Sequence, residues 1–357
     1  MSTLYTAYRQ NDPNELMPPH AHTASAVRFG LTGRQNFTGV EGEDITFLPG
    51  DMVLTPRDTW HNHGNRGGEP AINLSVLDYP LVENLNALSF QHDYQENGEV
   101  VRKQSARFQT EYSRMVYGAG GLTPRFLDHR RGGGDSSPMF VYRYEAMREL
   151  LYRFRDWDES PHEGVSIEYT HPLRGGPVYR TMTFFMQMVR PGETTLPLKQ
   201  TANLLVSPFS GQGSMTVGEQ RHALEPFDTV AVPSENWVQY RNDATEPLIL
   251  FIASDEPALR AMGLFHQWGR TDWRRPGRAG LRSPALAKQW NTSLLAHVDC
   301  EGADRSGWRA RRCMSRTCVR PTAPRSTTSK TRAARACWRR WKCPSAGIRT
   351  RCACATA

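Results

Sequence analysis

The feature that most constrains the fold of this chain is an internal repeat across its 357 residues. Two sets of positions recur at an offset of 178, each ending in a glycine: His20, His22, Ala26 and Gly33, then Leu198, Gln200, Leu204 and Gly211. Two further sets recur at an offset of 177: Gly50, Pro56, His61 and Asn65, then Phe227, Pro233, Val238 and Asn242. Both copies consist of short alternating segments separated by turn residues, which is typical of β-strands. The repeat therefore predicts two copies of one β-barrel.

The first copy holds a cluster of histidines that the second copy lacks. His20 and His22 stand two residues apart on an extended segment, so their side chains project from the same face. A later strand that returns His61 to that face completes three nitrogen donors around one point. Three histidines at this spacing favour a metal site over a structural role for each histidine alone.

We expect the chain to be divided into five segments. They are a metal-binding barrel over 1–84, a linker with loops and one helix over 85–180, a second barrel without metal over 181–256, a closing helix over 257–269, and a basic tail over 270–357. Ser137 before Pro138 predicts the start of the linker helix, because serine caps a helix and proline suits its first turn. The arginines of that helix, Arg143 among them, are expected on a solvated or intersubunit face.

Charge and cysteine are concentrated at the end of the chain. Residues 300–357 hold 15 basic and two acidic residues, whereas residues 1–299 hold 29 basic and 34 acidic ones. The net charge of +8 therefore does not indicate nucleic-acid binding by the barrels. All seven cysteines also lie at or beyond Cys300, so a metal in the barrels must be held by nitrogen or oxygen.

The tail has too few apolar residues to form a core. Residues 300–357 contain no leucine, phenylalanine or tyrosine, so burial cannot offset the entropy of ordering them. We interpret 270–357 as a disordered basic tail or an out-of-frame translation, with a zinc module as a weaker alternative. Neither a membrane-spanning run nor a signal segment is recognisable, so a cytoplasmic protein is expected, with no membrane and no nucleic-acid partner.

Two motifs carry a resemblance to a known family. The patterns His20-x-His22-x3-Ala26-x6-Gly33 and Gly50-x5-Pro56-x-Asp58-x2-His61-x3-Asn65 resemble the two signature motifs of the cupin superfamily. A duplicated barrel with histidines in the first copy is similar to the gentisate 1,2-dioxygenase family, which includes salicylate and 1-hydroxy-2-naphthoate dioxygenases. This resemblance implies an all-β-dominated bicupin, with two tandem jelly-roll barrels, a helical and loop linker, and a tail.

The resemblance also implies a chemistry and the residues that perform it. The metal would be Fe(II), held by His20, His22 and His61. Three histidines are implied without a carboxylate ligand, because Ala26 stands where many cupins have a glutamate ligand. The substrates would be O2 and a small aromatic hydroxy-acid such as gentisate or a salicylate, opened to an oxo diacid by a homotetramer. Arg28 lies six residues after His22, on the same strand face, and in relatives an arginine here binds the substrate carboxylate. His63 is expected to donate a hydrogen bond to bound oxygen or to a substrate oxygen. The structural alternatives are that Arg28 pairs with a nearby acid and that His63 is an ordinary rim residue.

The chain departs from the family pattern near its beginning. A glutamine typical of the first strand, eleven residues before the first ligand, is replaced by Arg9, and fewer residues precede the first barrel. Three alternatives therefore stay open: another metal-dependent cupin such as an isomerase or decarboxylase, a ligand-binding cupin that is no enzyme, or an inactive paralogue.

Overall fold

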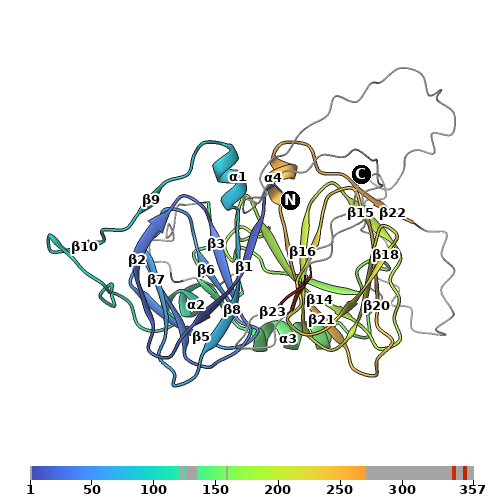
Figure 1. Ribbon diagram of the computed structural model, residues 1–357, viewed down its shortest axis with the longest axis horizontal. Coiled ribbons are helices and arrows are strands. Elements are labelled where there is room, and N and C mark those ends of the chain that lie inside the picture. The colour runs from blue at the N-terminus through green and yellow to red at the C-terminus, as the bar shows by residue number, and fades with distance from the viewer. Residues whose placement is uncertain are drawn as a thin grey trace, which may run out of the picture.

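The computed structural model describes residues 2–120, 122, 124, 135–157, 160–270, 340–342 and 349–351. Two β-barrels stand side by side, and the helices lie at their ends and edges (Figure 1). The strands of the first barrel are β1 Tyr5–Asn11, β2 Leu16–His22, β3 Ala26–Gly30, β4 Asn36–Val40, β5 Glu43–Phe47, β6 Met52–Thr55, β7 His61–Asn65 and β8 Ala71–Leu77. The predicted all-β-dominated fold with two tandem barrels is confirmed.

The second barrel repeats this order of strands. Its strands are β13 Val165–Glu168, β14 Thr183–Val189, β15 Leu198–Gln200, β16 Leu204–Ser210, β17 Gly213–Val217, β18 Gln220–Leu224, β19 Val230–Val232, β20 Trp237–Arg241, β21 Leu248–Ser254 and β22 Gln267–Gly269. Two strands from the end of the chain, β23 Arg340–Lys342 and β24 Arg349–Arg351, extend one of its sheets. The rest of the predicted basic tail lies outside the described residues.

Each barrel consists of two facing sheets. In the first barrel the sheets have the strand orders β1-β8-β3-β6-β12 and β5-β4-β7-β2-β9, where β9 is Phe90–Gln91 and β12 is Val141–Tyr142. In the second barrel the orders are β13-β14-β21-β16-β19-β24-β23 and β18-β17-β20-β15-β22. Strand β5 shows why such segments form: its residues alternate between buried and partly exposed, so one face packs inward and the other faces solvent.

The repeat extends to the register of the strands and to single hydrogen bonds. His20 pairs with His61 across β2 and β7, and Leu198 pairs with Val238 across β15 and β20. Asn65 Nδ2 donates to Asn11 O and Glu69 O, as Asn242 Nδ2 donates to Val189 O and Glu246 O. These matched contacts fix the residues that are equivalent in the two barrels.

The largest apolar core lies between the barrels and draws residues from both. Phe29 of β3 stacks on Phe251 of β21 with 4.0 Å between ring centroids, and Phe29 also meets Phe209 edge-on. Tyr8 of β1 reaches across to the second barrel, where its hydroxyl contacts Thr229 Oγ1 at 2.7 Å. Buried aromatic pairs of this kind stabilise the fold by about 0.5–1.5 kcal/mol each beyond the effect of the area they bury. Because residues of both barrels belong to the same cluster, the two barrels share one continuous core.

The linker differs from the sequence prediction at its helix. The linker contains α1 Tyr79–Asn84, β10 Gln95–Glu96, β11 Glu99–Val100, α2 Tyr112–Tyr117 and α3 Tyr144–Arg153. The predicted start at Ser137 and Pro138 is wrong, because Ser137 Oγ instead accepts from Met139 N and contacts the Tyr142 hydroxyl, ahead of strand β12. Helix α3 begins only after that strand.

Two further expectations about helices need correction. Arg143, expected on a solvated or intersubunit face, instead has a side chain that is only 20% exposed and donates within the chain to Asp51 Oδ2 at 2.5 Å and to Glu111. The predicted closing helix is shorter, α4 Glu256–Ala261, because the chain then returns as strand β22 beside β15. No helix in the described part of the chain is long and apolar enough to cross a membrane.

Candidate metal centre and substrate site

The three predicted metal ligands meet inside the first barrel. His20 and His22 come from β2 and His61 from β7, and one ring nitrogen of each lies within 4.8 Å of the others. All three side chains are buried, His61 completely. Strand alternation brings His20 and His22 to one face, and the antiparallel register brings His61 opposite them. Within the described residues, no other group of histidine, cysteine, aspartate or glutamate has this arrangement.

Each histidine is held by a hydrogen bond from its other nitrogen. The Nδ1 atoms lie 3.0 Å from Pro18 O for His20, 2.7 Å from Ala24 O for His22, and 2.8 Å from Thr59 O for His61. A carbonyl oxygen only accepts, so each Nδ1 carries the proton and donates it. Each Nε2 therefore presents a lone pair, as a neutral imidazole ligand must.

Burial keeps these imidazoles neutral. Desolvation lowers the pKa of His20 to about 4, although its bond to Pro18 opposes the shift. Desolvation also lowers the pKa of His61 well below its ordinary value, and the neighbouring His20 and His22 lower it further. Neutral nitrogens bind a cation without first losing a proton.

The residues present fit a divalent metal ion. His61 Nε2 is buried and has no hydrogen-bond partner, which is costly for a polar atom unless a ligand completes its coordination. Three imidazoles and no thiolate suit a first-row divalent ion such as iron. Ala26 is buried on β3 and supplies no carboxylate. This agrees with the expectation that the site has three histidine ligands and no fourth ligand from position 26.

Arg28 lies beside the histidines and has no carboxylate partner among the described ion pairs. Its Nη2 donates to His63 Nε2 at 2.6 Å, its Nη1 lies 3.5 Å from Thr55 Oγ1, and its Nε has no partner although it is buried. Desolvation, with a contribution from Arg9, lowers the pKa of Arg28 to about 9, so the guanidinium keeps its charge at neutral pH. The alternative that Arg28 pairs with an acid of the barrel is wrong.

His63 connects Arg28 to the opposite sheet. Its Nδ1 lies 3.1 Å from Thr38 Oγ1, and its ring centroid is 5.5 Å from that of His20. Because Arg28 donates to Nε2, the proton of the neutral ring is on Nδ1 and points to Thr38. His63 is 1% exposed, so the alternative that it is a rim residue is also wrong.

The sequence singled out Arg9 as a departure, and the structure places it in the same barrel interior. Arg9 pairs with Asn73 of β8, and Arg28 pairs with Ser75 two residues along the same strand. Arg9 Nε donates to Asn11 Oδ1 at 2.8 Å, and its charge contributes to the lowered pKa values of Arg28 and His63. A second guanidinium group thus lies near Arg28, although the Arg9 side chain is 27% exposed and its Nη2 is 3.8 Å from Glu15 Oε1.

Buried amides complete this interior, and sequence reasoning missed them. Asn36 and Asn73 are buried, and the Nδ2 atom of each has no hydrogen-bond partner. Strand alternation gives only a weak signal for them, because Ile72 and Leu74 on either side of Asn73 are themselves buried. Unpaired donors close to two cations favour a ligand that is anionic and rich in oxygen.

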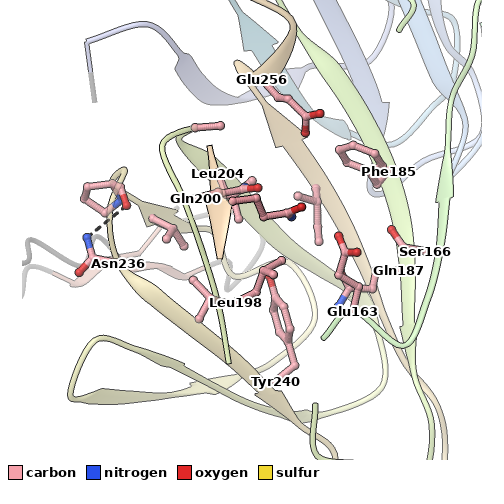
Figure 2. Close-up of a pocket in the computed structure, with 16 residues that line it drawn as sticks. Glu163, Ser166, Phe185, Gln187, Leu198, Gln200, Leu204, Asn236, Tyr240 and Glu256 are labelled. Carbon is pink, nitrogen blue, oxygen red and sulfur yellow. Dashed lines mark hydrogen bonds between the residues drawn. The ribbon is translucent and has the colours of Figure 1, made fainter. Parts of the chain in front are cut away.

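The equivalent positions of the second barrel line a cavity without histidines. Leu198, Gln200 and Val238 stand where the first barrel has His20, His22 and His61, and Figure 2 shows the first two of them beside this cavity. Leucine and valine have no donor atom for a metal. A three-histidine site is therefore confined to the first barrel of the described chain.

Known proteins match both the sequence and the fold. Residues 10–77 match the family described as "Cupin domain". The chain is 32% identical over 269 residues to gentisate 1,2-dioxygenase 1 of Aquipseudomonas alcaligenes, a match that covers 74% of each chain. It is 29% identical to the 1-hydroxy-2-naphthoate 1,2-dioxygenase of Nocardioides sp. (strain KP7), over 74% of this chain and 66% of that one.

A solved structure shows the same fold at lower sequence identity. The salicylate 1,2-dioxygenase of Pseudoaminobacter salicylatoxidans, in its adduct with gentisate, superposes with a TM-score of 0.67 at 22% identity. The superposition covers 76% of this chain and 73% of that chain. The duplicated barrel, the histidine cluster of its first copy and the match to the Aquipseudomonas enzyme together establish that this chain belongs to the gentisate 1,2-dioxygenase family of aromatic ring-cleaving dioxygenases.

Proposed function

We propose that the chain is an Fe(II)-dependent dioxygenase that uses O2 to open the ring of a hydroxybenzoate-type acid and yields an oxo diacid. The observation that supports this most directly is the pairing of two features in one buried interior. Three neutral imidazole nitrogens converge on one point, and Arg28, without a carboxylate partner, lies next to them. A metal site beside a cation suits a substrate that carries both a carboxylate and a metal-binding hydroxyl group.

The histidines would hold the ion, and three protein ligands leave other positions for substrate and oxygen. Bound Fe(II) would supply the redox chemistry that lets an aromatic ring react with O2. The Nδ1 hydrogen bonds to backbone carbonyls fix the ring planes, so the ligand geometry is set by the strands before the ion arrives. Metal retention should therefore depend on His20, His22 and His61.

Arg28 would bind the substrate carboxylate and orient the ring. Its planar fork forms two parallel hydrogen bonds to a carboxylate, and its buried position strengthens them. A carboxylate that takes the Nη2 donor of Arg28 releases His63 Nε2, which then accepts a hydrogen bond from the substrate hydroxyl group. His63 would thus accept instead of donate, unlike the expectation from sequence, because its ring proton is on Nδ1 and points to Thr38. Thr38 keeps the His63 ring in place during this exchange.

Gentisate is our leading substrate, with salicylates and 1-hydroxy-2-naphthoate next. All three have adjacent carboxylate and hydroxyl groups, and relatives named for each of them match this chain or its fold. Arg9 adds positive charge close to Arg28, partly balanced by Glu15, which favours an acid with further oxygen substituents. We further propose that the enzyme is a cytoplasmic homotetramer.

An oxygen electrode tests the activity directly. Purified chain reconstituted with Fe(II) without air should consume O2 on addition of gentisate, salicylate or 1-hydroxy-2-naphthoate, with a new absorption band from the opened ring. Benzoate, which lacks the hydroxyl group, is the matched control and should give no uptake. No uptake with any hydroxy-acid of the panel, in protein that holds one iron per chain, would favour a ligand-binding cupin or an inactive paralogue.

A further inference from the structure

The second barrel contains a cavity at the place where the first barrel has its histidines. The part of this space that a water-sized sphere can occupy has a volume of about 50 Å³, and the wider hollow of about 610 Å³ around it is partly open to solvent. Its walls come from the inward-facing residues of β14, β15, β16, β20 and β21, with α4 and β22 at one end. The duplication has therefore kept an interior space after the metal ligands were replaced.

The charge of this cavity is opposite to that of the first barrel. Its lining includes the carboxylates of Glu163 and Glu256 and contains no arginine, lysine or histidine. Glu256 binds Arg260 Nε at 2.5 Å, one turn along α4, so part of its charge is balanced outside the cavity. Burial and the charge of Glu256 raise the pKa of Glu163. A positively charged ligand beside Glu163 would favour its ionised form.

A buried amide in the same lining also lacks a partner. Gln187 of β14 is 2% exposed, and its Nε2 has no hydrogen-bond partner. Figure 2 shows Glu163 and Gln187 on one wall of the cavity, with Leu198 and Gln200 on the wall across from them. An unpaired buried donor beside a carboxylate calls for a ligand that carries an acceptor as well as a positive charge.

Much of the remaining lining is apolar, although Ser166, Gln200, Asn236 and Gln267 also contribute to it. Six large apolar side chains provide this surface: Phe185, Leu198, Leu204, Val232, Val238 and Ile252. Such walls exclude the fully hydrated ion and favour a ligand with a hydrocarbon body. Phe185 also gives an aromatic ring on which an ammonium group can lie.

We propose that the second barrel is a binding site for a small organic ammonium compound that has an apolar body and a hydrogen-bond acceptor. The ammonium group pairs with Glu163 and Glu256, the body packs against the apolar wall, and the acceptor takes the hydrogen bond of Gln187. A divalent metal ion fits less well, because Leu198 and Val238 replace two of the ligands that hold an ion in the other barrel. The proposal does not depend on ring cleavage in the first barrel.

Calorimetric titration of the whole chain with benzylamine tests this site. At pH 7.5 benzylamine is a cation, and benzyl alcohol is its neutral counterpart of similar shape. We expect one benzylamine site per chain, with at least tenfold weaker binding of benzyl alcohol. Glu163→Gln should weaken benzylamine binding at least tenfold, whereas Glu235→Gln, an exposed glutamate outside the cavity lining, should leave it unchanged.

Three further measurements locate the site and keep the test open to failure. Binding of benzylamine should be the same in His61→Ala, which assigns it to the second barrel. If Glu163→Gln does not fold, Glu256→Gln at the cavity end should still weaken binding at least threefold. Equal affinity for benzylamine and benzyl alcohol, unchanged affinity in both glutamate variants, or displacement of benzylamine by millimolar MgCl2 would each overturn the proposal.

Discussion

The two barrels of this chain have the same strand order and register, yet the interior of the first is mainly polar and that of the second is mainly aliphatic. The interior of the first barrel buries His20, His61 and Arg28 with several amides, and four of its buried polar atoms lack a partner: Arg28 Nε, Asn36 Nδ2, His61 Nε2 and Asn73 Nδ2. The second barrel encloses a cluster of aliphatic side chains that includes Val206, Val238 and Ile252. Val206 is the counterpart of Arg28 in the repeat.

This difference separates the energetic roles of the two copies. Each unpaired buried polar group costs about 1–3 kcal/mol, whereas each fully buried aliphatic side chain stabilises the fold by about 1.5–3 kcal/mol. The first copy therefore carries more of the unpaired polar groups that reduce stability, and the second copy supplies more of the apolar packing, although Gln187 of the second copy is also unpaired. The core between the barrels joins the two contributions.

The largest effect is expected from removing one histidine of the cluster. His61→Ala should abolish retention of iron and with it O2 uptake, because two imidazoles hold a divalent ion weakly. Its counterpart Val238→Ala should keep one iron per chain and lower the free energy of unfolding by roughly 2 kcal/mol. Elemental analysis of the purified variants and urea denaturation measure the two quantities. Stoichiometric iron in His61→Ala would disprove the ligand assignment.

A smaller, two-sided effect is expected at Arg28. Arg28→Met should raise KM about a hundredfold, because the substrate loses roughly 3 kcal/mol of buried charge-assisted hydrogen bonds. The same change should increase the free energy of unfolding by on the order of 1 kcal/mol, because it makes this part of the first barrel resemble Val206 of the second. Arg34→Met, at an exposed arginine, is the control and should alter neither quantity. A stability loss in Arg28→Met would show that the guanidinium supports the fold.

The smallest effect is a pH-dependent one at Glu163. Because the pKa of Glu163 is raised in the folded chain, the protonated form is preferred there, and wild-type stability should decrease as pH rises above the ordinary carboxyl value. Glu163→Gln removes this loss, so the difference in unfolding midpoint between variant and wild type should grow from pH 5 to pH 8. A constant difference for Glu163→Gln would place this carboxyl in contact with bulk water.

The spacing of residues in the sequence predicts the barrels and the histidine cluster well, because both depend on strand alternation. The common face of His20 and His22 follows from period two along β2, and the repeat identifies the second scaffold. Arg28 lies on β3 of the facing sheet, so its place beside them depends on how the two sheets pack. Contacts between segments distant in sequence cannot be predicted from strand alternation. The bond from Arg28 to His63, the pairing of Arg143 with Asp51 and the late start of α3 all depend on which strands become neighbours.

Residue type alone also misjudged some polar positions. Ser137 and Pro138 form a good helix start locally, but strand pairing of β12 with β6 overrides that preference. Asn36 and Asn73 read as ordinary strand residues until their burial is known. Such conflicts between local preference and tertiary structure are expected near functional sites.

The stack of Phe29 on Phe251 has a consequence for how the chain unfolds. A core shared between two barrels makes them melt in a single transition, since neither can open without exposing the other's aromatic surface. A ligand that binds one barrel then stabilises both, by an amount set by its concentration relative to its dissociation constant. Iron in the first barrel would thus protect the second from thermal unfolding, and a partner in the second would protect the iron site.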